Sequence, residues 1–234
     1  MYSTSHLTLH TSHLKKMSIE LNKKTGINLS KGSRISLEKD GHKLEEVCIG
    51  LNWGSIKKPA FFGLFKETIA VDLDGSVTTY GEQDGKENAI IETVYYKKLR
   101  SRDGAIIHSG DDRDGDTDGD DGFDNEVIQI KLNQVNPKVT SIVFYLNSYN
   151  NQDFADIPYS KIRIFEGTPT RVQSVFATFN LSGDASFKGY VSMVMGKLVR
   201  KPNGNWEFAT IGEAIAAKNI DDTILTIQSK YLLS

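Results

Sequence analysis

The sequence predicts an all-β fold, an antiparallel β-sandwich of about ten strands with one or two short helices, with a barrel of the same strands as the alternative. Two observations predict it. Polar and apolar residues alternate along most of the 234-residue chain, and Gly, Asn and Asp interrupt the alternation at short intervals. Runs with a period of two residues, bounded by turn residues, are typical of strands, whereas helical periodicity is rare in this chain.

The expected strands are rich in β-branched and aromatic residues, which fit a pleated and half-buried surface. Run 45–53, EEVCIGLNW, predicts a more deeply buried strand than the others. Its Cys48 is the single cysteine of the chain, so a disulfide framework is excluded, and a small buried hydrophobe is the expected role. In chain order the expected strands are 33–39, 45–53, 67–76, 89–99, 104–110, 126–132, 140–148, 161–167, 171–181, 190–201 and 205–212.

Helix signals are confined to two short segments, 158–162 (PYSKI) and 212–220 (GEAIAAKNI). The last segment, 221–234, contains one strand-like run, and the sequence assigns it no clear structural or functional role. No linker divides the chain, so residues 17–234 are expected to form a single domain. Residues 1–16 are rich in Ser, Thr and His and lack the long apolar centre of a secretion signal. They are expected to be an N-terminal extension outside the fold: a disordered tail, a segment before an alternative start at Met17, or a leftover of cloning.

The composition fits a globular protein with a packed core. Hydrophobic residues make up 38% of the chain, and the formal net charge is −2. This charge does not fit a protein that coats nucleic acid, so no nucleic-acid partner is expected. No run approaches the ~18 consecutive apolar residues of a membrane-spanning helix, so no transmembrane segment is expected either.

Negative charge is concentrated in one internal stretch, residues 108–126 (HSGDDRDGDTDGDDGFDNE). Nine of its nineteen residues are carboxylates, and Arg113 alone opposes them. Charge runs are commonly solvated loops, but this one lies between two predicted strands, where long structureless loops are uncommon. Two like charges ~5 Å apart at an effective dielectric of ~20 repel by roughly 3 kcal/mol. The loop is therefore either splayed in water or neutralised by a cation.

Oxygen ligands alone select hard cations, and many flexible carboxylates suit Ca²⁺, which takes about six to eight oxygens. From Asp114 the sequence DGDTDG fits the start of an EF-hand loop, but Asn125 then stands at the twelfth position and Glu126 comes one place late. The flanking segments also predict strands, where an EF-hand requires helices. The pattern therefore favours a calcium site and excludes an EF-hand.

A second acidic pair, Asp72 and Asp74, ends the run AVDLDGS. At a spacing of two residues both side chains point to the same face of a strand. Such a pair fits either a shared cation or a solvent-facing strand end with an Asx turn.

The segments VDLDGS (71–76), LRSRDGAIIHSGDDRDGDTDGDDGFDNEVIQIKL (99–132) and SIVFYLN (141–147) resemble the tellurium resistance TerD family in that order and spacing. The segments IGLNWG and GNWEFATIGEA are similar to the two Trp-containing signatures of the family. The resemblance covers roughly residues 17–217. It is specific, because the acidic loop and the Asp-x-Asp strand end occur together.

The resemblance implies a β-sandwich that binds Ca²⁺, usually two ions, in acidic loops at one end. It further implies a non-enzymatic role in tellurite resistance, phage and colicin resistance and general stress, as an adaptor or sensor. Other TerD-like proteins and a membrane-associated complex are the implied partners. The implied location is the cytoplasm, with a peripheral position at the inner face of the membrane as a refinement. By position, the metal roles fall on Asp72, Asp74, Asp111, Asp112, Asp116, Asp118, Asp120, Asp121 and Glu126.

The chain departs from the family pattern at several positions. Gly54 stands where Asp commonly follows the first Trp, Asp114 stands where Thr is usual, and residues 122–125 (GFDN) are inserted before Glu126. The insertion leaves open whether Glu126, Asp124 or neither completes the site. Segment 57–70 is also unusual. Its three aromatic residues, Phe61, Phe62 and Phe65, are expected in the core, with a surface patch for a partner as the alternative.

Two further functions remain as alternatives, a metal-dependent hydrolase and a cyclic-nucleotide-binding module. His108 lies beside Ser109 and Asp111, which suggests acid–base chemistry, although a structural role is the expected one for a histidine at a strand end. The sequence contains no Gly-x-Ser-x-Gly, P-loop or Rossmann fingerprint. The cyclic-nucleotide alternative comes from the resemblance alone.

Overall fold

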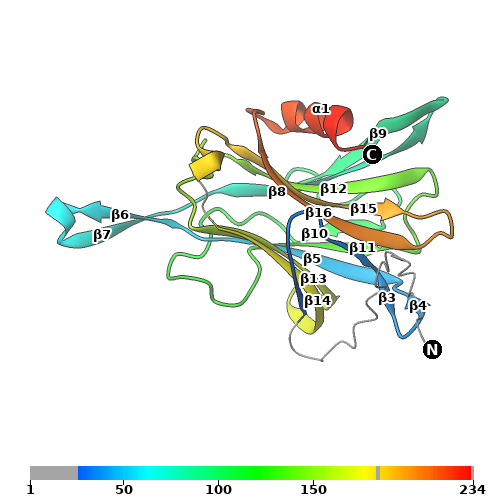
Figure 1. Ribbon diagram of the computed structural model, residues 1–234, viewed down its shortest axis with the longest axis horizontal. Coiled ribbons are helices and arrows are strands. Elements are labelled where there is room, and N and C mark those ends of the chain that lie inside the picture. The colour runs from blue at the N-terminus through cyan, green and yellow to red at the C-terminus, as the bar shows by residue number, and fades with distance from the viewer. Residues whose placement is uncertain (1–25, 183–184, 233–234) are drawn as a thin grey trace, which may run out of the picture.

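Two six-stranded β-sheets pack face to face in the computed structural model, which describes residues 26–182 and 185–232 (Figure 1). The first sheet has the order β1 (Ile27–Leu29), β14 (Arg171–Ser182), β13 (Tyr159–Thr168), β5 (Glu46–Trp53), β11 (Glu126–Lys131) and β10 (Ile106–His108). The second has the order β2 (Arg34–Ser36), β16 (Trp206–Ile215), β15 (Ser192–Arg200), β12 (Val139–Ser148), β8 (Leu73–Gln83) and β9 (Lys86–Val94). The neighbours pair antiparallel apart from β1 and β14 within the described ranges, so the predicted all-β sandwich is confirmed.

Alternating side chains of the two sheets form the main core, as the period of two residues predicts. Ile49 and Leu51 of β5 meet Phe144 of β12 and Phe208 of β16 in this core, and all four are fully buried. Strand β5 is buried on its other face as well, where Cys48 packs with Val127 and Phe165. Cys48 is 0% exposed, and burial raises the pKa of its thiol to about 12. The prediction of a small buried hydrophobe is confirmed.

The described residues hold one α-helix, α1 (Ile220–Lys230), which covers the outer face of the second sheet (Figure 1). Asn219 begins it by accepting a 2.9 Å hydrogen bond from the amide of Asp222, and Ile227 packs against Tyr145 and Val143. The two predicted helices were wrong. Residues 212–215 continue β16 and pair with β15, and Tyr159 begins β13. Strand pairing overrides the helix propensity of the alanines in 212–220.

Short elements complete the fold. Strands β3 (Glu38–Lys39) and β4 (His42–Lys43) form one hairpin, and β6 (Ile56–Ala60) and β7 (Phe65–Ile69) form another, joined by the 3₁₀ turn η1 (Phe61–Gly63). A second 3₁₀ turn is η2 (Ala185–Phe187). The predicted extension 1–16 lies outside the described residues. None of the helices in the described ranges is both long and apolar enough to cross a membrane.

Strand register brings the acidic segments to one end of the sandwich. The last residue of β5, Trp53, pairs with Ser160 near the start of β13, and Glu126 at the start of β11 pairs with Leu51. Across the second sheet, Leu73 at the start of β8 pairs with Ser148 at the end of β12. The β6–β7 hairpin projects from the same end (Figure 1).

Because that hairpin pairs only with itself among the named sheets, its tip has no core to enter. Phe61 is 78% exposed, Phe62 is 107% exposed and Phe65 is 68% exposed. The expectation that these aromatic residues lie in the core was therefore wrong.

Candidate metal centre

The acidic loop, residues 109–125, connects β10 to β11 and is fastened to neighbouring backbone. The amide of Asp116 donates a 3.0 Å hydrogen bond to the carbonyl of Trp53, and the amide of Ser55 donates to the carbonyl of Asp116 at 3.1 Å. The amide of Val71 donates to the carbonyl of Asp114 at 3.1 Å. The loop therefore lies against the end of β5 and the approach to β8, and its strand flanks confirm that it is not an EF-hand.

Three aspartates form what we call the first cluster: Asp72, Asp74 and Asp111, each with one carboxylate oxygen within 4.8 Å of the others. Asp74 lies in β8 and Asp72 immediately precedes that strand, so the spacing of two residues places both on one side, as the sequence predicts. Asp111 comes from the acidic loop and accepts a 3.0 Å hydrogen bond from Arg113 Nε at its outer side.

The first cluster carries more negative charge than the exposed Arg113 offsets. Asp74 is 8% exposed, and burial, followed by the charges of Asp72, Glu126 and Asp111, raises its pKa to about 7. Burial and the charge of Asp111 likewise raise the pKa of Asp72, although Arg113 lowers it. Carboxylates that are hard to ionise together are stabilised by a cation placed among them.

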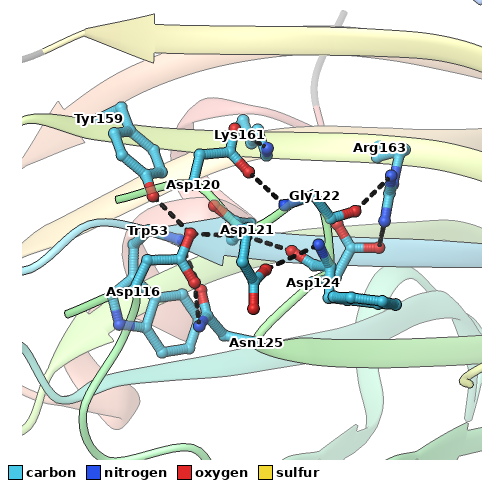
Figure 2. Close-up of polar contacts among 12 residues, drawn as sticks. Trp53, Asp116, Asp120, Asp121, Gly122, Asp124, Asn125, Tyr159, Lys161 and Arg163 are labelled. Carbon is cyan, nitrogen blue, oxygen red and sulfur yellow. Dashed lines mark hydrogen bonds and ion pairs between the residues drawn. The ribbon is translucent and has the colours of Figure 1, made fainter. Parts of the chain in front are cut away.

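A second cluster consists of Asp116, Asp120 and Asp121, whose carboxylate oxygens also approach within 4.8 Å of one another (Figure 2). Asp116 is the buried member. Its Oδ2 accepts hydrogen bonds from Tyr159 Oη at 2.5 Å and from Asn52 Nδ2 at 3.2 Å. The two other members are exposed and cap their own loop through the amides of residues 122 and 123.

A lysine already compensates part of the second cluster. Lys161 Nζ lies 2.5 Å from Asp120 Oδ2 (Figure 2). Burial raises the pKa of Asp120, but the hydrogen bonds from Lys161 and from the amide of Gly122 outweigh it, and the pKa is lowered. The second cluster is therefore better neutralised by protein groups than the first.

The close approach of Tyr159 requires glycine at residue 54. A Cβ at residue 54 would lie 2.6 Å from Tyr159 Cε1 and 2.9 Å from Pro158 Cγ. The tyrosine ring fills the space of a side chain at residue 54, and its hydroxyl reaches Asp116 instead.

Three of the predicted ligands lie outside both clusters. Asp112 Oδ1 accepts the amides of Asp114 and Gly115 at 3.1 and 2.9 Å, which shapes the loop. Asp118 is exposed. Glu126 is fully buried below the first cluster, and its role as a ligand stays a prediction, as it does for the other two.

Glu126 connects the elements that carry the first cluster. Its Oε2 accepts the amide of Gly75 at 2.7 Å, and its Oε1 accepts the amide of Asp112 at 3.3 Å. A Cβ on Gly75 would lie 2.2 Å from Glu126 Oε2, so only glycine allows this approach. Burial raises the pKa of Glu126 above its usual value, and the adjacent His108 offsets only part of that rise.

His108 faces the interior through both ring nitrogens. Nε2 lies 3.0 Å from the carbonyl oxygen of Gly75, and Nδ1 accepts the amide of Gly110 at 3.1 Å. Its side chain is 0% exposed. A general acid or base must reach the proton that it transfers. The geometry therefore gives a structural role to His108 and does not support acid–base catalysis by this residue.

Asp124, considered above as a late ligand, is bound by an arginine instead. Arg163 donates from Nε at 3.1 Å and from Nη2 at 2.8 Å to Asp124 Oδ2, and the Asp124 side chain is 2% exposed (Figure 2). A Cβ on Gly50 would lie 1.9 Å from the same oxygen. Residues 122–125 therefore fold back onto the first sheet.

Sequence reasoning missed the residues of β5 and β13 that surround the second cluster: Asn52, Tyr159, Lys161 and Arg163. The signal was weak but present, because Asn52 interrupts the apolar run of β5, and residues 159, 161 and 163 alternate along one face of a strand. Their proximity to the acidic loop depends on the pairing of β13 with β5, which sequence periodicity does not specify.

The fold and the site together define a class of protein: a β-sandwich whose acidic loops gather two aspartate clusters at one end. Within this class, the chain belongs to the TerD family, since the model of the TerD domain matches residues 25–223. The match includes both clusters and ends inside α1.

Named relatives align with this chain over nearly their whole length. Tellurium resistance protein TerZ of Serratia marcescens is 32% identical over 197 residues, covering 84% of this chain and 94% of that protein. Stress response protein SCP2 of Bacillus subtilis (strain 168) is 29% identical and covers 85% of this chain and 97% of its own length. The chain thus belongs to a family of tellurium resistance and general stress proteins.

A solved structure shares the fold. The crystal structure of a homologue of telluride resistance protein (TerD) from Streptomyces coelicolor A3(2) superposes with a TM-score of 0.51 at 20% identity, covering 74% of this chain and 90% of that one.

Proposed function

We propose that this chain is a non-enzymatic Ca²⁺-binding protein of a tellurite and general stress resistance system. The single observation that carries the proposal is the first cluster, in which three carboxylates, one of them buried, converge within 4.8 Å of one another. The donor set consists of oxygens alone, which suits a hard cation, and the exposed side of Asp111 leaves room for water ligands. Calcium is preferred to magnesium because its coordination tolerates irregular sets of carboxylates.

A second ion would bind at Asp116, Asp120 and Asp121. Here Ca²⁺ competes with Lys161 for Asp120, so we expect this site to be the weaker of the two. Binding at the first cluster would join the acidic loop to β8. Binding at the second would tie the outer part of the loop to Asp116, which contacts β5 and β13. The shape of this end would then depend on calcium.

A sensor or adaptor role follows from that dependence. The ordered end would present a surface to other TerD-like proteins or to a membrane-associated complex. Direct reduction of tellurite by this chain is disfavoured, because the single Cys48 is fully buried and has a raised pKa. The resistance named for the relatives would then come about indirectly.

The test is a calorimetric Ca²⁺ titration of the wild type and of three variants. Asp74→Asn should abolish the tighter site, and Asp120→Asn should weaken only the second one. Asp118→Asn serves as a control because Asp118 is an exposed acidic residue of the same loop outside both clusters. Calcium at 100 times its Kd should also raise the free energy of unfolding by ~2.7 kcal/mol. Equal binding by all four proteins, or no binding, would overturn the proposal.

A further inference from the structure

The β6–β7 hairpin, residues 56–69, has a composition and exposure that the acidic site does not explain. We call it the aromatic arm. Its five pairs run from Ile56↔Ile69 to Ala60↔Phe65, and it projects from the end of the sandwich that carries the acidic loop (Figure 1). Its tip exposes Phe61, Phe62, Leu64 and Phe65, each at 68% or more.

Both faces of the arm are exposed along the two strands. Successive residues of a strand point to opposite sides, and Lys57, Lys58 and Pro59 of β6 are all exposed, as are residues 65–68 of β7. Phe61 and Phe62 adopt positive φ angles of 48° and 55°, a conformation that bulky residues seldom adopt. An isolated two-stranded hairpin has little stability of its own, so exposed aromatics at its tip require another explanation.

Basic residues follow the aromatic tip along both strands. Three lysines, Lys57, Lys58 and Lys66, and one acidic residue, Glu67, give the arm a net charge of +2. All four are exposed. Exposed Phe and Leu side chains of peripheral elements bury at the boundary between lipid headgroups and acyl chains, and lysines nearby are attracted to anionic headgroups.

We infer that the aromatic arm inserts its tip into the interfacial region of an anionic lipid bilayer. A protein partner would be expected to bind along one face of the hairpin, but the exposed large apolar residues gather at the tip, and the strands behind it carry lysines. A bilayer takes up an apolar tip end-on and contacts the basic residues behind it. The aromatic tip would lie at the boundary with the acyl chains, and the lysines behind it would lie at the depth of the headgroups.

The arm is connected to both aspartate clusters at its base. The chain leaves the sandwich at Gly54, which forms an isolated β-bridge with Asp116. The amide of Ser55 donates to the carbonyl of Asp116, and Lys57 Nζ donates to the carbonyl of Thr117. The chain returns at Val71, next to Asp72. Unneutralised carboxylates at the base would repel an anionic surface, and bound Ca²⁺ would remove that repulsion. This calcium dependence rests on the proposed function, whereas the insertion of the tip does not.

The test is flotation of the full chain with vesicles of phosphatidylcholine alone or mixed equally with phosphatidylglycerol, in Ca²⁺ or in chelator. Wild type should float with the anionic vesicles in Ca²⁺. The triple variant Phe61→Ser/Phe62→Ser/Phe65→Ser should bind them at least ~10-fold more weakly. Lys58→Gln/Lys66→Gln should lose ~5-fold for each lysine. Leu225→Ser is the matched control, because it removes an exposed apolar residue of α1 and should leave binding unchanged.

Each outcome decides one of the two hypotheses. If the triple variant floats as well as wild type, or if wild type ignores anionic vesicles while calorimetry detects Ca²⁺, the inference about the arm is wrong. If wild type floats equally with and without Ca²⁺ and calorimetry detects no ion, the arm inference stands and the proposed function fails. Wild type could instead form dimers in analytical ultracentrifugation without binding vesicles. If only the triple variant abolishes these dimers, the partner of the arm is a second copy of the chain, and the inference is wrong.

Discussion

His108 Nε2 lies 3.3 Å from Glu126 Oε2, and both side chains are fully buried. The two residues come from adjacent strands of the first sheet, β10 and β11, and they contact Gly75 of the second sheet. The pair therefore crosses the interior directly below the first cluster. It fixes the position of β8, which carries Asp74, relative to the acidic loop, which carries Asp111.

Replacing Glu126 with Gln should destabilise the protein strongly. The amide group of Gln would place a donor against the backbone amide of Gly75 or of Asp112, both of which donate to the carboxylate now. Leaving a buried backbone donor without its acceptor costs roughly 1–3 kcal/mol. Urea denaturation at neutral pH, in chelator so that metal binding does not contribute, measures the loss.

The matched control is Glu82→Gln in β8. Glu82 pairs with Lys138 at 3.5 Å, but its side chain is 49% exposed. Exposed pairs contribute little to stability, so Glu82→Gln should leave the urea midpoint nearly unchanged. Equal losses for the two variants would mean that the buried carboxylate is not a structural element of this end.

Calcium binding at the first cluster should weaken as the pH falls below about 7. The pKa of Asp74 is raised to about 7, so its carboxyl must release a proton when the cation binds. Affinity should fall by up to about tenfold for each pH unit in this range if one proton is released. Calorimetric titrations in buffers of different ionisation enthalpy measure both the affinity and the proton count. An affinity that is flat across the slightly acidic range would contradict the assignment.

Without calcium, the same shift predicts the opposite trend for stability. The reference pKa of Asp is 3.8, and in the folded state the pKa of Asp74 is higher. The stability that this group contributes is therefore fully present below pH 3.8 and is lost as the pH rises through about 7. In chelator, Asp74→Asn should flatten the decline in melting temperature between weakly acidic and neutral pH, whereas Asp118→Asn should not.

The sequence contains enough information for the strands and for part of the site. The apolar run 45–53 predicts the deep burial of β5, and the spacing of Asp72 and Asp74 predicts that they share one side of the strand end. The burial of Glu126 was also readable in principle, because Glu126, Ile128 and Ile130 alternate on one face and both isoleucines lie in the core. Because Glu126 ends the acidic stretch, the sequence predicts a metal ligand at this position instead of a buried structural residue.

Other features depend on contacts between segments distant in the chain. The second cluster forms because β13 pairs with β5 and presents Tyr159 and Lys161 to the acidic loop. Helix α1 forms where local propensity suggested a strand, because the outer face of the second sheet offers an apolar surface to Ile227. Sequence periodicity specifies the buried faces of elements but not which elements become neighbours.

The buried Asp124–Arg163 pair should contribute strongly to the free energy of unfolding. Arg163→Met would leave the carboxylate of Asp124, 2% exposed, without its cation, at a cost of roughly 3–5 kcal/mol. Adding Asp124→Asn should recover part of that loss, because the uncompensated charge is removed. The control is Arg34→Met, since Arg34 is 51% exposed beside Glu207 and should cost at most about 1 kcal/mol. Chemical denaturation of the four proteins decides between a coupled pair and two independent contributions.

Helix α1 should stabilise the second sheet through one face alone. Ile227 is 0% exposed against Tyr145 and Val143, whereas Leu225 of the same helix is 58% exposed. Ile227→Ala should cost about 2–5 kcal/mol, because it removes buried methyl groups and leaves a cavity. Leu225→Ala should change the free energy of unfolding by no more than about 0.5 kcal/mol. Thermal and urea denaturation measure both changes. Similar small losses for the two variants would show that the helix does not pack on the sheet in solution.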